Sequence, residues 1–212
     1  MKAALFDLDG VVFDTEPQYT VFWGKTAREY HPEIPNLEHL IKGQTLTQIF
    51  DKFFAGQTEE QAVITQRLNE FELNMTFNYV EGFEDYVRGL RAKGVKTAVV
   101  TSSNCEKMES VYRQRPEFKS LFDAILTSED FDESKPSPDC YLKAAARFGV
   151  KPEECVVFED SFNGLKSGRA SGAYVVGLAT TNPAEAIRPY ADQVTVNYVQ
   201  LTIDNSQFII DN

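Results

Sequence analysis

The chain has 212 residues, 42% of them hydrophobic and 25% charged, which is an ordinary balance for one large globular domain or a domain that carries an insertion. Its formal net charge of −11 disfavours nucleic acid and anionic membranes as partners, because both are bound through basic patches. No signal peptide or membrane span is visible, so we expect a cytoplasmic protein, as a monomer or weak oligomer. Cys105, Cys140 and Cys155 show no CxxC spacing and are expected to be buried free thiols.

Short apolar runs that end in polar residues alternate with helical patterns along most of the chain. Helical patterns that end near a glycine cover residues 84–93, 138–148 and 161–170. This alternation predicts an α/β fold, with a Rossmann-like, doubly wound parallel sheet as its core. The five predicted strands are residues 3–9, 95–102, 124–128, 156–160 and 173–179.

One long stretch breaks this alternation. Between Asp14 and about Tyr79 there is no strand signal, and apolar and aromatic residues recur at helical spacing. Thr58 and Gln61 have the spacing of a capping box, which predicts that a helix begins there. We therefore expect a core domain of residues 1–14 and 80–212 and an inserted helical bundle of residues 15–79.

The first predicted strand ends in two aspartates, Asp7 and Asp9. Residues two apart in a strand point the same way, so both side chains should lie at the carboxyl end of the strand, where open α/β sheets bind ligands. Two carboxylates about 4 Å apart repel by about 4 kcal/mol at an effective dielectric constant of 20. This arrangement predicts a cation between them or a protonated carboxyl, although a plain strand end followed by an Asp-Gly turn would give the same residues.

Residues 7–16 (DLDGVVFDTE) resemble the first motif of the haloacid dehalogenase superfamily, whose members mostly transfer phosphoryl groups through an aspartyl phosphate. The three later motifs of that family resemble residues 99–104, 134–139 and 156–161, in the family's order. The position of the insertion and the ending FEDS make the chain similar to the β-phosphoglucomutase-like subgroup of phosphatases and mutases. In that subgroup the insertion is a helical cap that closes over the active site.

The resemblance assigns chemistry to four acidic residues. Asp7 would be the nucleophile and a metal ligand. Asp9 would be the general acid–base and would also bind the metal through its backbone carbonyl. Glu159 and Asp160 would complete the site, with Asp160 as a direct ligand and Glu159 binding either directly or through water. A set of oxygen ligands suits Mg²⁺.

The resemblance also implies a phosphate-binding set. The Thr101 hydroxyl and the backbone amides of Ser102 and Ser103 would hold the phosphate oxygens, and Lys135 would bridge Asp7 and the phosphate. Gly43 lies in a loop of the insertion that related proteins use to contact the substrate, although a plain helix–helix turn explains it equally well.

The expected function is therefore a Mg²⁺-dependent phosphatase acting on small phosphorylated metabolites, with sugar phosphates as the expected class. The alternative is a hexose-phosphate mutase, but Leu46 and Tyr19 stand where the mutases have an arginine and a histidine. A non-enzymatic receiver domain is disfavoured, because receivers place the acidic pair first and the lysine last. The identity of the metabolite is left open by the sequence.

Overall fold

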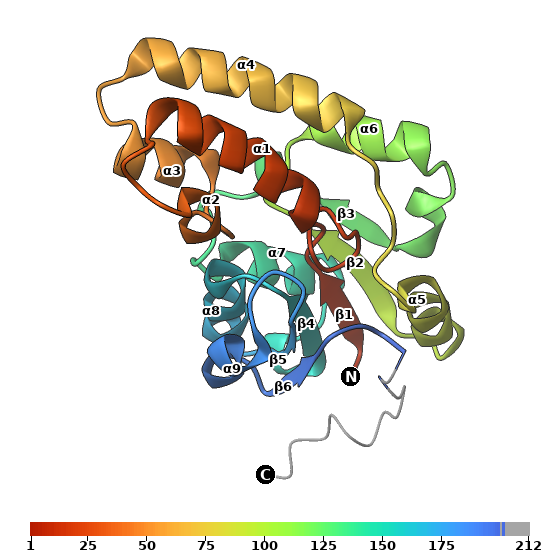
Figure 1. Cartoon of the computed structure of the whole chain (residues 1–212). Coiled ribbons are helices and arrows are strands. Elements are labelled where there is room, and N and C mark those ends of the chain that lie inside the picture. The colour runs from red at the N-terminus through yellow and green to blue at the C-terminus, as the bar shows by residue number, and fades with distance from the viewer. Residues whose placement is uncertain (200, 202–212) are drawn as a thin grey trace.

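The computed structural model describes residues 1–199 and 201, and in this part of the chain one parallel sheet of six strands forms the core (Figure 1). The strand order is β3-β2-β1-β4-β5-β6, which is the order of a Rossmann-like doubly wound sheet and confirms the predicted fold class. Five strands match the predicted runs; β6, a half-buried edge strand of three residues, was not predicted because it has no apolar run. The strands are β1 (Ala3–Phe6), β2 (Lys96–Val100), β3 (Ala124–Leu126), β4 (Cys155–Glu159), β5 (Tyr174–Leu178) and β6 (Gln193–Thr195).

Helices cover both faces of the sheet. Ala4 and Phe6 of β1 pack in one hydrophobic cluster, while Ala3 and Leu5 pack in another, as the alternation of a buried strand requires. The first cluster includes side chains of α5 and α6, and the second includes side chains of α7 and α8. The helices of the core are α5 (Phe83–Ala92), α6 (Cys105–Gln114), α7 (Asp139–Arg147), α8 (Phe162–Ser171) and α9 (Ala184–Ile187), with short 3₁₀ turns at Phe118–Leu121, Ser128–Asp130, Pro152–Glu154 and Arg188–Tyr190.

Four helices lie between β1 and α5, and Figure 1 shows them on one side of the sheet, with α4 farthest from it. They enclose a hydrophobic cluster of their own that includes Trp23, Ile49 and Ile64. The predicted capping box at Thr58 is wrong, because α4 is preceded by Gln57 without a side-chain cap; the capping box belongs to α3, where Thr45 and Gln48 form it. The four helices are α1 (Glu16–Tyr30), α2 (Leu37–Leu40), α3 (Leu46–Phe53) and α4 (Thr58–Asn74).

The chain leaves the sheet and returns to it through two paired segments. The amide of Asp14 donates to the carbonyl of Asn78 at 2.8 Å, and the amide of Val80 donates to the carbonyl of Val12 at 2.9 Å. Met75 and Phe77, which precede this pairing, pack in the same hydrophobic cluster as β1. The chain therefore packs against the core within a few residues of the end of α4.

Three further predictions concern the surface and the ends of the chain. Cys140 and Cys155 are buried, but Cys105 is exposed in the first turn of α6, so the prediction of burial is wrong for that residue. Within the described residues, no helix is long and apolar enough to cross a membrane. The predicted core extends to residue 212, of which residues 200 and 202–212 lie outside the described part.

Candidate active site

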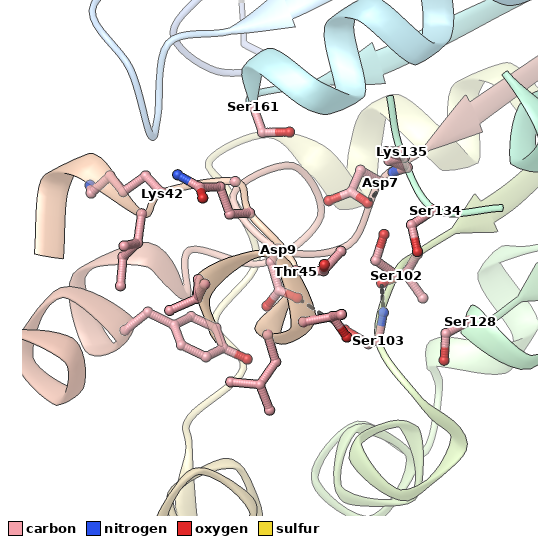
Figure 2. A pocket seen from close by; sticks show the side chains of 18 of the residues that line it. Asp7, Asp9, Lys42, Thr45, Ser102, Ser103, Ser128, Ser134, Lys135 and Ser161 are labelled. Atoms are coloured by element: carbon pink, nitrogen blue, oxygen red, sulfur yellow. Dashed lines mark hydrogen bonds and ion pairs between the residues drawn. The ribbon is translucent and has the colours of Figure 1, made fainter. Parts of the chain in front are cut away.

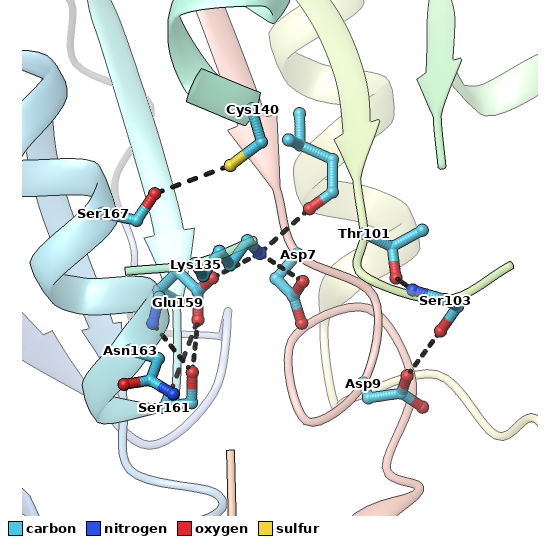
Figure 3. Close-up of polar contacts among 12 residues, drawn as sticks. Asp7, Asp9, Thr101, Ser103, Lys135, Cys140, Glu159, Ser161, Asn163 and Ser167 are labelled. Carbon is cyan, nitrogen blue, oxygen red and sulfur yellow. Dashed lines mark hydrogen bonds and ion pairs between the residues drawn. The ribbon is translucent and has the colours of Figure 1, made fainter. Parts of the chain in front are cut away.

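The buried ammonium group of Lys135 joins the ends of β1, β2 and β4. Its Nζ donates to Asp7 Oδ1 at 2.7 Å, to Glu159 Oε1 at 2.6 Å and to the Val100 carbonyl at 3.1 Å (Figure 3). Burial acts to lower the pKa of Lys135, but the ion pairs with Asp7 and Glu159 outweigh burial and hold the pKa well above its ordinary value. The lysine is thus a fixed positive charge beside Asp7.

Three carboxyl groups meet around this lysine. Asp7, Glu159 and Asp160 each offer an oxygen, and the three oxygens lie within 4.8 Å of one another. Burial raises the pKa of Asp7 to about 7 despite the opposing effect of Lys135, and burial raises the pKa of Asp160 well above its ordinary value, with neighbouring carboxylates adding to the effect. One lysine cannot neutralise three carboxylates, so the cluster favours a bound dication. The purely oxygen donor set fits Mg²⁺.

Glu159 lies beneath the cavity rather than in its wall. Its Oε1 accepts from Lys135 and from the Tyr141 hydroxyl, at 2.6 and 2.7 Å, and its Oε2 accepts from the backbone amides of Asp160 and Ser161, at 3.1 and 3.4 Å. Both oxygens are therefore already hydrogen-bonded. This arrangement favours a role in which Glu159 orients its neighbours or binds a metal through water.

The Asp9 carboxylate lies apart from the acidic cluster (Figure 3). Strand β1 ends at Phe6, so the strand alternation extends to neither aspartate. Both side chains nevertheless line the same cavity at the carboxyl end of the strand, as expected. Asp9 Oδ1 accepts from Thr15 at 2.7 Å, and Oδ2 accepts from Ser103 at 3.2 Å and from Lys107 Nζ at 2.5 Å.

These contacts also set the protonation of Asp9. Burial acts to raise its pKa, but the charge of Lys107 and the hydrogen bonds that Asp9 accepts outweigh burial and lower the pKa. The contribution of the Asp9 backbone carbonyl to a metal site stays a prediction.

The predicted phosphate loop follows β2. Thr101 is buried, and its Oγ1 accepts from the Ser103 amide at 3.0 Å, so that amide already has a partner. Helix α6 begins at Cys105, with Asn104 as its N-cap. Ser102 is exposed and lines the cavity.

A cavity of about 570 Å³ lies between the sheet and the inserted helices (Figure 2). It brings together nearly all the predicted site residues from both parts of the chain. Leu46, Tyr19 and Lys42 of the inserted segment also line it. The predicted site residues in its wall are Asp7, Asp9, Gly43, Thr101, Ser102, Ser103, Lys135 and Asp160.

Three residues that contact the predicted site residues were not themselves predicted. Lys107 and Tyr141 lie on amphipathic helices, where a lysine or a tyrosine carries no signal of a partner far away in the sequence. Thr181, whose hydroxyl donates to Asp160, follows β5 at the same edge of the sheet. Its position after the carboxyl end of a strand was the one available signal for it.

A parallel sheet with an acidic cluster and a buried lysine at its carboxyl edge, beneath inserted helices, is typical of capped phosphohydrolases. The model of the haloacid dehalogenase-like hydrolase family matches residues 1–172. The chain belongs to that family.

The relatives of the chain agree with this assignment. It is 32% identical over 201 residues to a probable pseudouridine-5'-phosphatase of Drosophila melanogaster, with 90% of this chain and 87% of the relative covered. It is 30% identical over 213 residues to hexitol phosphatase A of Escherichia coli K12, with 98% of this chain and 93% of the relative covered. These relatives confirm the prediction of a phosphoric monoester hydrolase.

A solved structure shows the same fold. The β-phosphoglucomutase of Clostridium difficile superposes with a TM-score of 0.78 at 21% identity, and the match covers 98% of this chain and 96% of the mutase. The resemblance to the β-phosphoglucomutase-like subgroup is thereby confirmed at the level of the fold.

Proposed function

We propose that the protein is a Mg²⁺-dependent phosphatase that hydrolyses small phosphorylated metabolites, with sugar and polyol phosphates as the substrate class, through a phosphoryl group carried on Asp7. The observation that carries this proposal is the position of Asp7, which is fixed by Lys135 within an acidic cluster at the wall of the cavity. The names of the relatives, among them a pseudouridine-5'-phosphatase and a hexitol phosphatase, support the substrate class.

In the proposed reaction, Asp7 attacks phosphorus and the bond to the leaving oxygen breaks. Lys135 holds one oxygen of Asp7 and balances charge on the phosphoryl group. Asp9 gives a proton to the leaving oxygen, then takes a proton from the water that attacks the aspartyl phosphate and releases phosphate. Asp7 and Asp160 would hold Mg²⁺ directly. When bound, the ion would neutralise negative charge on the transferring phosphoryl group.

Thr101 and Ser102 would hold the non-bridging oxygens of the phosphoryl group. The same proposal divides the chain into a core, residues 1–14 and 80–212, and a cap, residues 15–79, that limits access of water to the cavity.

Gly43 would contact the substrate from the cap. Its location supports this role, because it lines the cavity, has a φ of 69° and accepts at its carbonyl a hydrogen bond from Asn163 of α8.

Replacing Asp7 with asparagine tests the nucleophile. We expect Asp7→Asn to lower phosphate release from p-nitrophenyl phosphate by on the order of 10³ or more, because no attacking carboxylate remains. Excess EDTA should likewise abolish turnover by the wild-type enzyme, and Mg²⁺ should restore it. Retention of more than a few per cent of activity by Asp7→Asn would mean that water attacks phosphorus directly; undiminished turnover in EDTA would refute the metal requirement.

The alternative, a hexose-phosphate mutase, requires a donor from the cap for the second phosphate of a bisphosphate. Leu46 cannot donate a hydrogen bond, and the Tyr19 hydroxyl already accepts from Lys107 and donates to Glu72, at 2.6 and 2.7 Å. With β-glucose 1-phosphate and a catalytic amount of the bisphosphate, we expect phosphate release to exceed formation of glucose 6-phosphate. Isomerisation faster than phosphate release would favour the mutase.

A further inference from the structure

Lys107 is a buried lysine that belongs to none of the family motifs quoted above. It lies in the first turns of α6, and its side chain is only 2% exposed. Its Nζ contacts Asp9 Oδ2 at 2.5 Å and the Tyr19 hydroxyl at 2.6 Å, and it lies 4.9 Å from the centre of the Tyr19 ring. A lysine in such a place is tolerated only with good partners, because an unpaired buried ammonium is strongly destabilising.

The partners of Lys107 form a chain that crosses from the core to the inserted helices. Tyr19 of α1 donates its hydroxyl hydrogen to Glu72 of α4 at 2.7 Å, which leaves the hydroxyl oxygen to accept from Lys107. Asp9, on the turn after β1, completes the chain at the other end. The ammonium group is therefore held from α1 and from the turn after β1.

Among the described residues, Lys107 is the one charged group that pairs with Asp9. The other hydrogen bonds to the Asp9 carboxylate come from two neutral hydroxyls, those of Thr15 and Ser103. The two hydroxyls carry no net charge, so only Lys107 adds the Coulomb attraction of an opposite charge to its hydrogen bond. Loss of Lys107 would leave the carboxylate with neutral partners alone.

We propose that Lys107 is a positioning residue for Asp9: it fixes the carboxylate that exchanges protons with the leaving group and with water, and Tyr19 fixes Lys107 in turn. This inference rests on the proposed function, in which Asp9 is the general acid–base. Lys107 itself needs no contact with the substrate for this role.

The inference predicts a dependence on the leaving group. An alkyl phosphate needs its leaving oxygen protonated, whereas p-nitrophenolate leaves readily without a proton, and kcat/KM reports on this first chemical step. For Lys107→Met we expect kcat/KM for β-glycerol phosphate to fall at least about tenfold more than kcat/KM for p-nitrophenyl phosphate. Lys107→Arg, which keeps the cation, should recover part of the ratio between the two substrates.

A merely structural role would lower both values equally, since it would only reduce the amount of folded enzyme. Lys2→Met is a matched control, because Lys2 pairs with Glu154 at the opposite edge of the sheet and should leave the ratio unchanged. Should Lys107→Met fail to fold, Tyr19→Phe removes one partner of the ammonium and leaves the ion pair, and we expect the same change to a smaller extent. A ratio unchanged in every folded variant would overturn the inference.

A double mutant shows whether Lys107 acts through Asp9. Asp9→Asn alone should lower the ratio of β-glycerol phosphate to p-nitrophenyl phosphate activity, and adding Lys107→Met should lower it no further. Full additivity of the two losses would overturn the role proposed for Lys107. An Asp9→Asn enzyme with an unchanged ratio would instead refute the acid–base role of Asp9, so the two failures are distinguishable.

Discussion

Gly164 allows α8 to approach the acidic cluster. It lies in the first turn of α8, and a Cβ atom at this position would overlap the Glu159 carboxylate. That carboxylate is buried and hydrogen-bonded through both oxygens, so it has little freedom to move. The glycine is therefore required by the site, although an interior helical glycine is otherwise unfavourable by about 1 kcal/mol.

We expect Gly164→Ala to raise the Mg²⁺ concentration needed for half-maximal activity and to lower kcat about tenfold or more, because a displaced Glu159 moves both Lys135 and Asp160. Magnesium titrations of activity and urea unfolding would measure these effects. Gly24→Ala in α1 is the matched control: a Cβ there would lie at least 3.5 Å from its neighbours, so this variant should keep its activity and gain about 0.5–1 kcal/mol. Equal behaviour of the two variants would contradict the steric explanation.

Individual site residues could be predicted where a motif places them at the end of a strand. Asp7 and Asp160 directly follow β1 and β4 in this way, and Lys135, from the motif in the loop before α7, reaches Asp7. The partners of Asp9 could not be predicted, because Lys107 is 98 positions away in the sequence and its orientation depends on how α6 packs. Spacing along the chain carries no information on such a contact.

Helix α3 and the loop before it connect the inserted helices to the core. Thr45 Oγ1 accepts from the Gln48 amide at 3.3 Å, and the Gln48 side chain accepts from the Thr45 amide at 3.0 Å, which completes the capping box. The same Gln48 side chain accepts from Asn163 of α8 at 3.1 Å. One glutamine therefore both begins α3 and contacts the core.

Thr45→Ala should lower the free energy of unfolding by about 1 kcal/mol, because the amide at the third helical position loses its partner. The measurement is urea unfolding followed by circular dichroism. Thr58→Ala is the control, since Thr58 makes no capping bond at the start of α4 and its replacement should change stability by less than about 0.5 kcal/mol. A greater loss at Thr58 than at Thr45 would show that the cap assignments are reversed.

Helices and strands could be predicted where hydrophobic periodicity is strong, but their ends were predicted less accurately. Strands β1 to β5 and helices α5, α7 and α8 follow the predicted runs within a few residues. Strand β6 was missed because a short edge strand, partly exposed, needs no apolar run. The start of α4 at Thr58 was predicted correctly, but its capping box was not, because Thr-Glu-Glu-Gln occurs equally well inside the first helical turn.

The whole molecule combines two hydrophobic clusters around the sheet with a third inside the inserted helices. The insertion begins and ends at adjacent points, since Gln18 Nε2 donates to the Thr76 carbonyl at 2.8 Å. Met75 and Phe77 pack with the sheet and should be kept when the insertion is removed.

Replacing residues 19–72 with a short Gly-Ser linker should leave a core that folds and hydrolyses p-nitrophenyl phosphate weakly. Such a variant should lose discrimination among phosphate esters, because the walls of the cavity that face the leaving group are removed. Ratios of kcat/KM over a panel of sugar, polyol and nucleoside phosphates measure this. Ratios equal to those of the full chain would show that the core selects the substrate.

The position of β1 in the sheet has a consequence for how the protein is made. Its two neighbours, β2 and β4, begin about 90 and 150 residues after β1 ends. On the ribosome, β1 therefore emerges long before either partner, whereas the four inserted helices that follow it can bury their own cluster at once. Since Glu159 ends β4 and Asp160 follows it, the acidic cluster is completed only when β4 has been synthesised, so the nascent protein has its inserted helices before it has its acidic cluster.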